Sequence, residues 1–110
     1  MKSLFLINPK ITALEYTVVY GAGKEGQMLY DRLQKEHITV DYFADSNCQL
    51  WGKVIKGIEV ISLEQLKAIN YQTAVLLSKG YQEQIYEFLV ENGIKNIFLS
   101  HVENGIILAD

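Results

Sequence analysis

The chain has 110 residues, a formal net charge of −3 and a pI near 5.3, and its 49% hydrophobic content supports one packed domain rather than disorder. The acidic balance and the absence of a Lys/Arg run argue against a nucleic-acid or anionic-membrane partner. The single cysteine, Cys48, excludes an internal disulfide and disfavours a zinc cluster, so we expect a cytoplasmic protein without a metal site.

Short apolar runs alternate with proline-free amphipathic stretches beyond residue 16. β-Branched and aromatic runs predict strands, and apolar residues spaced by three and four predict helices. We expect an N-terminal arm over residues 1–16 and one domain over residues 17–110. Ser62 and Gln65 form a capping-box pattern, and Gly93 suits a left-handed helix C-cap. In chain order the pattern predicts a strand at 17–20, a helix at 24–36, a strand at 38–44, a turn-rich stretch at 45–56, a strand at 58–61, a helix from Ser62 to 69, a strand at 74–77, a helix at 82–92, and strands at 97–99 and 106–108.

Strands that alternate with helices and are continuously apolar are typical of a parallel sheet covered on both faces. The fold class is therefore α/β, a Rossmann-like three-layer fold. With right-handed crossovers the expected strand order is 3-2-1-4-5, counted along the chain. A ligand should then bind at the carboxyl ends of the first and fourth of these strands, where the order reverses.

The clearest motif is a glycine pattern between the first strand and the first helix. Gly21, Gly23 and Gly26 form G-x-G-x-x-G. The first glycine permits a tight turn, the second lets backbone approach a pyrophosphate, and the third lets the helix pack close to the strand. The helix amides and dipole then favour an anion. We assign the whole loop, Gly21, Ala22, Gly23, Lys24, Glu25 and Gly26, to a cofactor site, with Lys24 as a phosphate contact.

Asp45 lies at the end of the second strand, about 20 residues beyond the glycine loop. From there a carboxylate can accept hydrogen bonds from ribose hydroxyls and repel a 2′-phosphate, so NAD should bind better than NADP. We include Ser46 in the same site. The alternative is that Asp45 only begins the turn that follows.

The loop after the fourth strand should face the same ligand. Ser78 and the amide of Gly80 could contact ribose or phosphate, and Tyr81 could stack on a base. The alternative is an ordinary loop, just as the three glycines could serve only the strand–helix joint. Trp51 is expected to anchor the long loop onto the body of the domain.

Catalytic motifs are missing. No P-loop or nucleophile elbow occurs, and the Tyr20/Lys24 spacing joins a buried strand to a loop rather than forming a dehydrogenase pair. A hydride-transfer enzyme also needs a substrate pocket beyond its dinucleotide half. We therefore expect no catalytic residues and no enzymatic activity of the domain alone.

Four segments, 19–26, 40–47, 51–53 and 57–62, resemble one recurrent module. It is the Rossmann-like nucleotide-binding domain of bacterial polysaccharide-biosynthesis proteins, attached to nucleotide-sugar dehydratases, sugar acyltransferases, and FkbM-type methyltransferases and glycosyltransferases. The resemblance covers about 17–99.

The resemblance implies NAD or a UDP-sugar as ligand, with CoA less favoured, bound at the Gly21–Gly26 loop and Asp45. Acyltransferase modules usually carry a histidine in the glycine loop, where this chain has Lys24-Glu25, and continue into hexapeptide repeats that are missing here. The loop is more similar to the methyltransferase- and glycosyltransferase-associated version.

Three hypotheses follow. The preferred one is a non-catalytic nucleotide-binding module serving glycan synthesis, compatible with a homo-oligomer or an attached catalytic domain. The second is a structural or protein-interaction domain with a vestigial pocket. The third, an oxidoreductase completed across a dimer, is disfavoured because no acid–base pair is visible.

Overall fold

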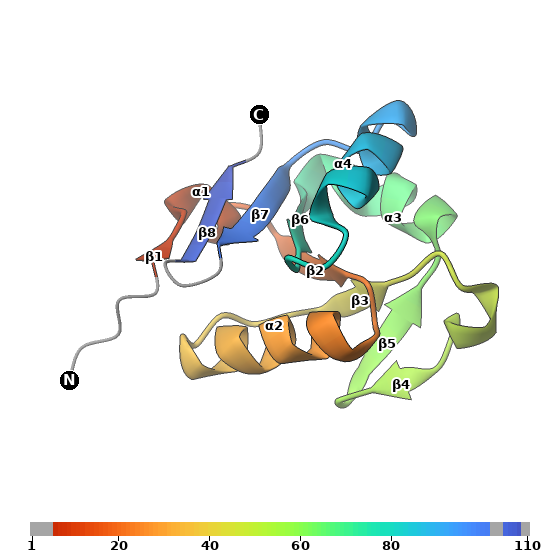
Figure 1. Cartoon of the computed structure of the whole chain (residues 1–110), viewed down its shortest axis with the longest axis horizontal. Helices are drawn as coiled ribbons and strands as arrows, with labels where there is room; N and C mark the ends of the chain where they lie inside the picture. The colour runs from red at the N-terminus through yellow and green to blue at the C-terminus, as the bar shows by residue number, and fades with distance from the viewer. Residues whose placement is uncertain (1–5, 102–104, 109–110) are drawn as a thin grey trace.

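The strands form one sheet between two layers of helices (Figure 1). The structure is a computed structural model, and it describes residues 6–101 and 105–108. Its strands are β1 (Leu6–Ile7), β2 (Tyr16–Tyr20), β3 (Tyr42–Ala44), β4 (Val54–Ile55), β5 (Ile58–Ile61), β6 (Thr73–Leu77), β7 (Ile97–His101) and β8 (Gly105–Leu108). Its helices are α1 (Pro9–Thr12), α2 (Lys24–Lys35), α3 (Leu63–Ile69) and α4 (Gln82–Glu91), with 3₁₀ turns at Cys48–Leu50 and Asn70–Gln72.

The strand order is β1-β8-β7-β6-β2-β3-β5-β4. Its central part, β5-β3-β2-β6-β7, is the predicted order 3-2-1-4-5, and these strands pair in parallel. The Rossmann-like fold class is thus confirmed. At the two margins, β8 runs antiparallel to β7 and β4 runs antiparallel to β5.

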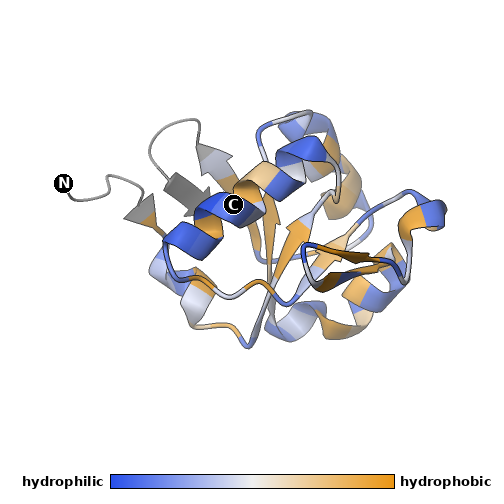
Figure 2. Ribbon diagram, turned by 90° about the horizontal axis from the view of Figure 1, so that it is seen from below, coloured by the Kyte–Doolittle hydropathy of each residue, from blue (hydrophilic) through white to orange (hydrophobic). Residues whose placement is uncertain are grey.

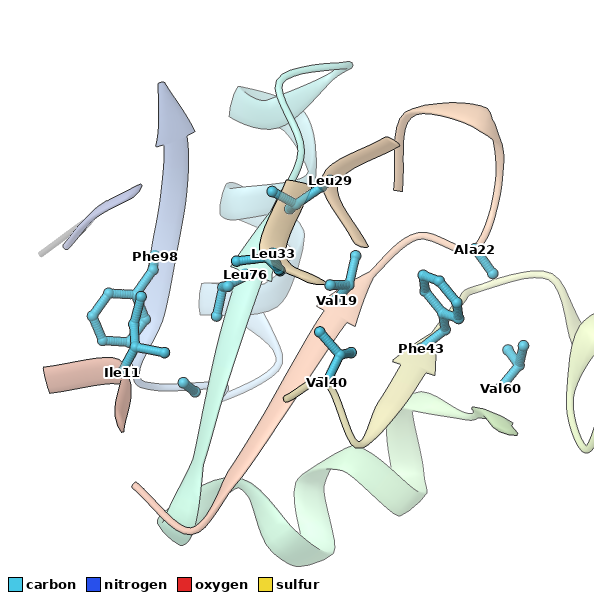
Figure 3. Packing of buried hydrophobic residues seen from close by; sticks show 11 residues of the cluster. Ile11, Val19, Ala22, Leu29, Leu33, Val40, Phe43, Val60, Leu76 and Phe98 are labelled. Atoms are coloured by element: carbon cyan, nitrogen blue, oxygen red, sulfur yellow. The ribbon is translucent and has the colours of Figure 1, made fainter. Parts of the chain in front are cut away.

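Side chains alternate between the two faces along each strand, and helices cover both faces, so each strand contributes to two buried clusters. Val19 belongs to the cluster on the α2 side, with Leu29 and Leu33 of that helix, whereas Val18 belongs to the cluster on the α3/α4 side, with Leu66 and Leu89. Figure 2 shows the apolar strands inside and the polar outer faces of the helices. Figure 3 shows the α2-side cluster, in which Val19, Leu33 and Leu76 lie together.

The N-terminal segment contributes to this packing. Leu6–Ile7 pairs with β8, and Asn8 caps the short helix α1 by accepting a hydrogen bond from the amide of Lys10. Ile11 of that helix is fully buried beside Phe98 (Figure 3). The described part of the predicted arm therefore packs onto the domain, and the division at residue 17 stays a prediction.

The second predicted strand is shorter than expected. The apolar pattern predicts 38–44, but the structure has strand only at Tyr42–Ala44. Before this strand, Asp41 is joined to Thr17 of β2 by two hydrogen bonds, one of which uses the Asp41 side chain. The amide of Thr17 donates to the Asp41 carboxylate at 2.8 Å, and the amide of Asp41 donates to the Thr17 carbonyl at 2.8 Å. A side chain there replaces part of the backbone ladder.

Helix ends follow the sequence signals. The Ser62 hydroxyl accepts from the amide of Gln65, whose side chain accepts from the amide of Ser62, so the predicted capping box is confirmed. Gly93 follows α4 with a φ of +78°, which confirms the left-handed C-cap.

Candidate functional site

The glycine loop joins the carboxyl end of β2 to the start of α2. Gly21 has a φ of +103°, which side-chain-bearing residues rarely adopt, and its amide donates to the Ala44 carbonyl at 2.6 Å. The chain then turns away from the sheet and enters the helix at Lys24, with Gly23 as N-cap. The tight turn that the sequence predicts is present.

Gly26 and Gly23 differ in whether the packing of the domain requires a glycine at that position. A Cβ at Gly26 would collide with the carbonyl oxygen of Gly21, so only glycine lets the helix pack this close to the strand. A Cβ at Gly23 would meet nothing within 4 Å. Packing within the domain therefore explains the glycine at 26 and leaves the glycine at 23 unexplained.

The first turn of α2 offers backbone donors. The first amides of a helix have no partner within the helix, and Gly23 brings no side chain to cap them. The amides of Lys24, Glu25 and Gly26 are thus arranged to bind an anion, and the helix dipole adds to their partial positive charge. Among the described residues Lys24 forms no ion pair, so its ammonium group can add to this field.

Asp45 lies directly beside this loop. Its Oδ2 accepts from the amide of Ala22 at 2.8 Å, and its Oδ1 accepts from the amide of Asn47 at 2.8 Å. The carboxylate therefore both fixes the glycine loop and begins the following turn. Because each carboxylate oxygen has two lone pairs, both can still accept from a ligand hydroxyl.

Ser46 and Trp51, which lie near Asp45, each form a hydrogen bond within the domain. The Ser46 hydroxyl lies 2.6 Å from the hydroxyl of Tyr20. Burial raises the pKa of Tyr20 above its ordinary value, the Ser46 bond opposes that rise, and the charge of Asp45 adds to it. The indole nitrogen of Trp51 donates to the Asp45 carbonyl at 2.6 Å. This bond lies within the turn-rich stretch itself and the side chain is 43% exposed, so Trp51 braces the loop internally rather than anchoring it onto the body of the domain as expected.

The loop between β6 and α4 approaches the glycine loop. A Cβ at Gly80 would lie 3.1 Å from the Glu25 Cγ, so the two loops are in contact. Ser78 is buried, whereas Tyr81 is 80% exposed and has a φ of +54°. The topology thus brings the predicted loop to the same end of the sheet as Asp45.

Sequence reasoning missed one residue of this region. The Gln82 Nε2 donates to the carbonyls of Ser78 at 3.2 Å and Ser100 at 3.1 Å. It ties the β6–α4 loop to the end of β7. A glutamine at the start of a helix carries no motif that would have revealed this role.

Solved structures with a similar fold were found by structural comparison. UDP-D-quinovosamine 4-dehydrogenase from Vibrio fischeri aligns with a TM-score of 0.61 at 20% identity, over 80% of this chain and 79% of that one. RSP, a Rex-family repressor, aligns in its complex with β-NADH with a TM-score of 0.54 at 29% identity, over 83% of this chain and 49% of that one. In its complex with β-NAD⁺ and operator DNA, RSP aligns with a TM-score of 0.55 at 29% identity, over 84% of this chain and 48% of that one. This chain thus spans about half the length of RSP.

The comparison with RSP corrects one prediction. We expected the acidic balance to exclude a nucleic-acid partner, yet a protein of similar fold is seen with operator DNA and NAD⁺ together. The exclusion was wrong because net charge describes only this chain, and about half of RSP lies outside the match. The charge of one domain says nothing of a domain beside it.

Among the described residues no helix is long and apolar enough to cross a membrane. A search of curated proteins gives no match. The sequence profile of the family "C2185-like, N-terminal" matches residues 14–97, which is most of the chain and includes β2, the glycine loop, Asp45 and the β6–α4 loop. The chain therefore belongs to the C2185-like N-terminal family, on a Rossmann-like fold.

Proposed function

We propose that this domain binds a nucleotide with an internal diphosphate, of the NAD type, at the carboxyl ends of β2 and β6. The observation that carries the proposal is Gly23. The domain's own packing does not require a glycine there, but a phosphate approaching the free amides of α2 would require it. The Asp45 carboxylate stands beside the same loop.

The site residues take the following roles. The amides of Lys24, Glu25 and Gly26 hold the diphosphate, and the ammonium group of Lys24 adds charge. Asp45 accepts from ribose hydroxyls while it holds the amide of Ala22. The remaining residues, Gly21, Ser46, Ser78 and Gly80, shape the two loops on either side.

NAD is favoured over a UDP-sugar or CoA because two RSP structures with this fold, at 29% identity, contain NADH or NAD⁺. The dehydrogenase whose name includes a UDP-sugar supports only the fold at 20% identity. A role in glycan synthesis follows solely from the sequence resemblance, and we keep it as part of the proposal on that ground. We also propose that the domain binds without catalysis of its own.

The test is isothermal titration calorimetry of the chain with NAD⁺, NADH, NADP⁺, UDP-glucose and CoA, alongside thermal denaturation. A ligand at 100 times its Kd should stabilise the fold by about 2.7 kcal/mol. Gly23→Val should abolish binding and keep the fold, because a Cβ at residue 23 meets no atom of the domain within 4 Å.

Ala68→Val, on the exposed surface of α3, adds a similar volume away from the loop and should bind like the unchanged chain. Absence of binding by every ligand, in folded protein, would overturn the proposal and favour an interaction domain. Equal binding by Gly23→Val would show that the ligand does not use the glycine loop.

A further inference from the structure

Glu25 is an acidic side chain at a position arranged for anions. It belongs to the first turn of α2, and its side chain lies against Gly80 of the β6–α4 loop. Its Cγ and Cδ lie 3.1 and 3.8 Å from the position of a Cβ at residue 80. The aliphatic part of this exposed side chain therefore contacts the β6–α4 loop, and Glu25 itself supplies one of the amides of the proposed diphosphate site. It forms no ion pair with any residue that the structure describes.

Two carboxylates and two ammonium groups thus lie on the segments around the loop amides. Asp45 stands on the β3 side and Glu25 on the β6 side, with Lys24 in the glycine loop and the exposed Lys79 next to Gly80 in the β6–α4 loop. The backbone amides attract any phosphate, whereas the carboxylates repel each added unit of negative charge. Total ligand charge therefore decides how strongly Glu25 opposes binding.

Phosphate groups differ in charge according to their esterification. A terminal phosphate monoester carries about −1.5 to −2 at pH 7, whereas an internal diester phosphate carries a single negative charge. A diphosphate esterified at both ends is therefore about one charge less negative than one that ends in a free phosphate.

We propose that Glu25 makes this site select diphosphates esterified at both ends over nucleotides that end in a phosphate. The inference rests on the proposed function and names the side chain that sets its preference for an internal diphosphate. The carboxylate of Glu25 is the selecting group, because Glu25 belongs to the first turn of α2, whose amides form the proposed site.

The experiment compares ADP-ribose with ADP by calorimetry at low ionic strength. The two ligands share the adenosine diphosphate and differ by the ribose that esterifies the second phosphate, so the change in their ratio on substitution of Glu25, rather than the ratio itself, reports the charge effect. We expect the unchanged chain to bind ADP-ribose more tightly. Glu25→Gln should reduce the ratio of the two dissociation constants by about threefold, the scale of one exposed charge pair. Added salt should shrink that reduction because it screens exposed charges.

Glu91→Gln is the matched control, since it removes the same charge at the far end of α4, about 15 Å along the helix from the loop. It should leave the ratio unchanged. An unchanged ratio in Glu25→Gln, with ADP-ribose still bound, would overturn this inference alone. Failure of both ligands to bind either protein would overturn the proposed function and this inference with it.

Discussion

An aspartate lies at each end of the paired strands β2 and β3, and each accepts a hydrogen bond from a backbone amide. The two aspartates differ in which segment that amide belongs to. At the amino end, Asp41 accepts from the amide of Thr17, a strand residue. At the carboxyl end, Asp45 accepts from the amide of Ala22, inside the glycine loop. Both bonds are 2.8 Å long, so the bond alone does not distinguish a binding aspartate from a structural one.

Asp41 and Asp45 differ in the groups that surround them. Around Asp41 there is an open hollow of about 270 Å³, lined in part by Glu15, His37 and Thr39, with no helix N-terminus supplying free amides among its lining residues. Around Asp45 there are the loop amides of α2 and a glycine that internal packing does not require. The carboxyl end thus has the features of the proposed phosphate site, and the described residues at the amino end lack them, so changes at the two ends should have different consequences.

The largest effect is expected within the glycine loop itself. Gly26→Ala should destabilise the fold by about 3 kcal/mol or more, since its Cβ would collide with the Gly21 backbone. Gly23→Ala should lower the free energy of unfolding by only about 0.5–1 kcal/mol, because alanine is a poorer helix N-cap than glycine but its Cβ meets no atom within 4 Å. Urea denaturation measures both. Similar losses of unfolding free energy in the two variants would contradict the claim that packing requires glycine at residue 26 but not at residue 23.

The two aspartates give the next largest effect. Asp41→Ala and Asp45→Ala should each lower the free energy of unfolding by about 1–3 kcal/mol, because the first leaves the amide of Thr17 without its side-chain acceptor and the second leaves those of Ala22 and Asn47. Only Asp45→Ala should also weaken NAD⁺ binding, by about tenfold or more. If Asp41→Ala weakened binding equally, the comparison between the two ends would fail.

β2 also carries a tyrosine at each end, and they should differ at alkaline pH. Burial raises the pKa of Tyr20 above its ordinary 10.0. Below pH 10 both folded and unfolded chains keep this proton. Above it the unfolded chain loses the proton first, so stability should fall until the pH passes the folded pKa.

Tyr20→Phe should flatten this fall, as followed by urea denaturation between pH 9 and 11. Tyr16→Phe should flatten it less, since the Tyr16 pKa is raised mainly by the charge of Glu15 and its hydroxyl is not buried. A larger effect of Tyr16→Phe would show that burial of Tyr20 is not the main cause.

The smallest effect concerns two residues with positive φ, His37 near the amino end and Tyr81 near the carboxyl end, at +61° and +54°. Glycine at either position should stabilise the fold by up to about 1 kcal/mol by relieving the backbone. Thermal denaturation should show a rise of a few degrees in Tm for both. A fall in Tm for Tyr81→Gly would mean that its exposed ring makes a stabilising contact.

Much of the fold could be predicted from the sequence. The apolar runs of the central strands and the crossover rule were sufficient for the order 3-2-1-4-5, and the Ser62–Gln65 box located the start of α3. The strand predicted at 106–108 corresponds to β8, whereas β1, α1 and β4 were not predicted. Asn8-Pro9 is a helix-start pattern that fits α1, and β4 pairs with β5 through a turn at Lys56-Gly57, both with positive φ.

The site was predicted as a set of residues, but not how they are engaged. Sequence spacing cannot show that Asp45 already binds the amide of Ala22, that Ser46 meets Tyr20, or that Gln82 ties two loops together. These contacts join residues from different elements, and they depend on side-chain directions that only the folded chain defines. Their ligand-binding roles remain predictions.

The most direct test of the account is a titration of ¹⁵N-labelled protein with NAD⁺, followed by the amide resonances in two-dimensional NMR spectra. The account predicts that the resonances of Lys24, Glu25 and Gly26 shift most, with those of Ala22 and Asn47 beside Asp45 following, while Thr17 and Asp41 at the amino end stay unchanged. Shifts concentrated around Asp41, or no shift at millimolar NAD⁺, would contradict it.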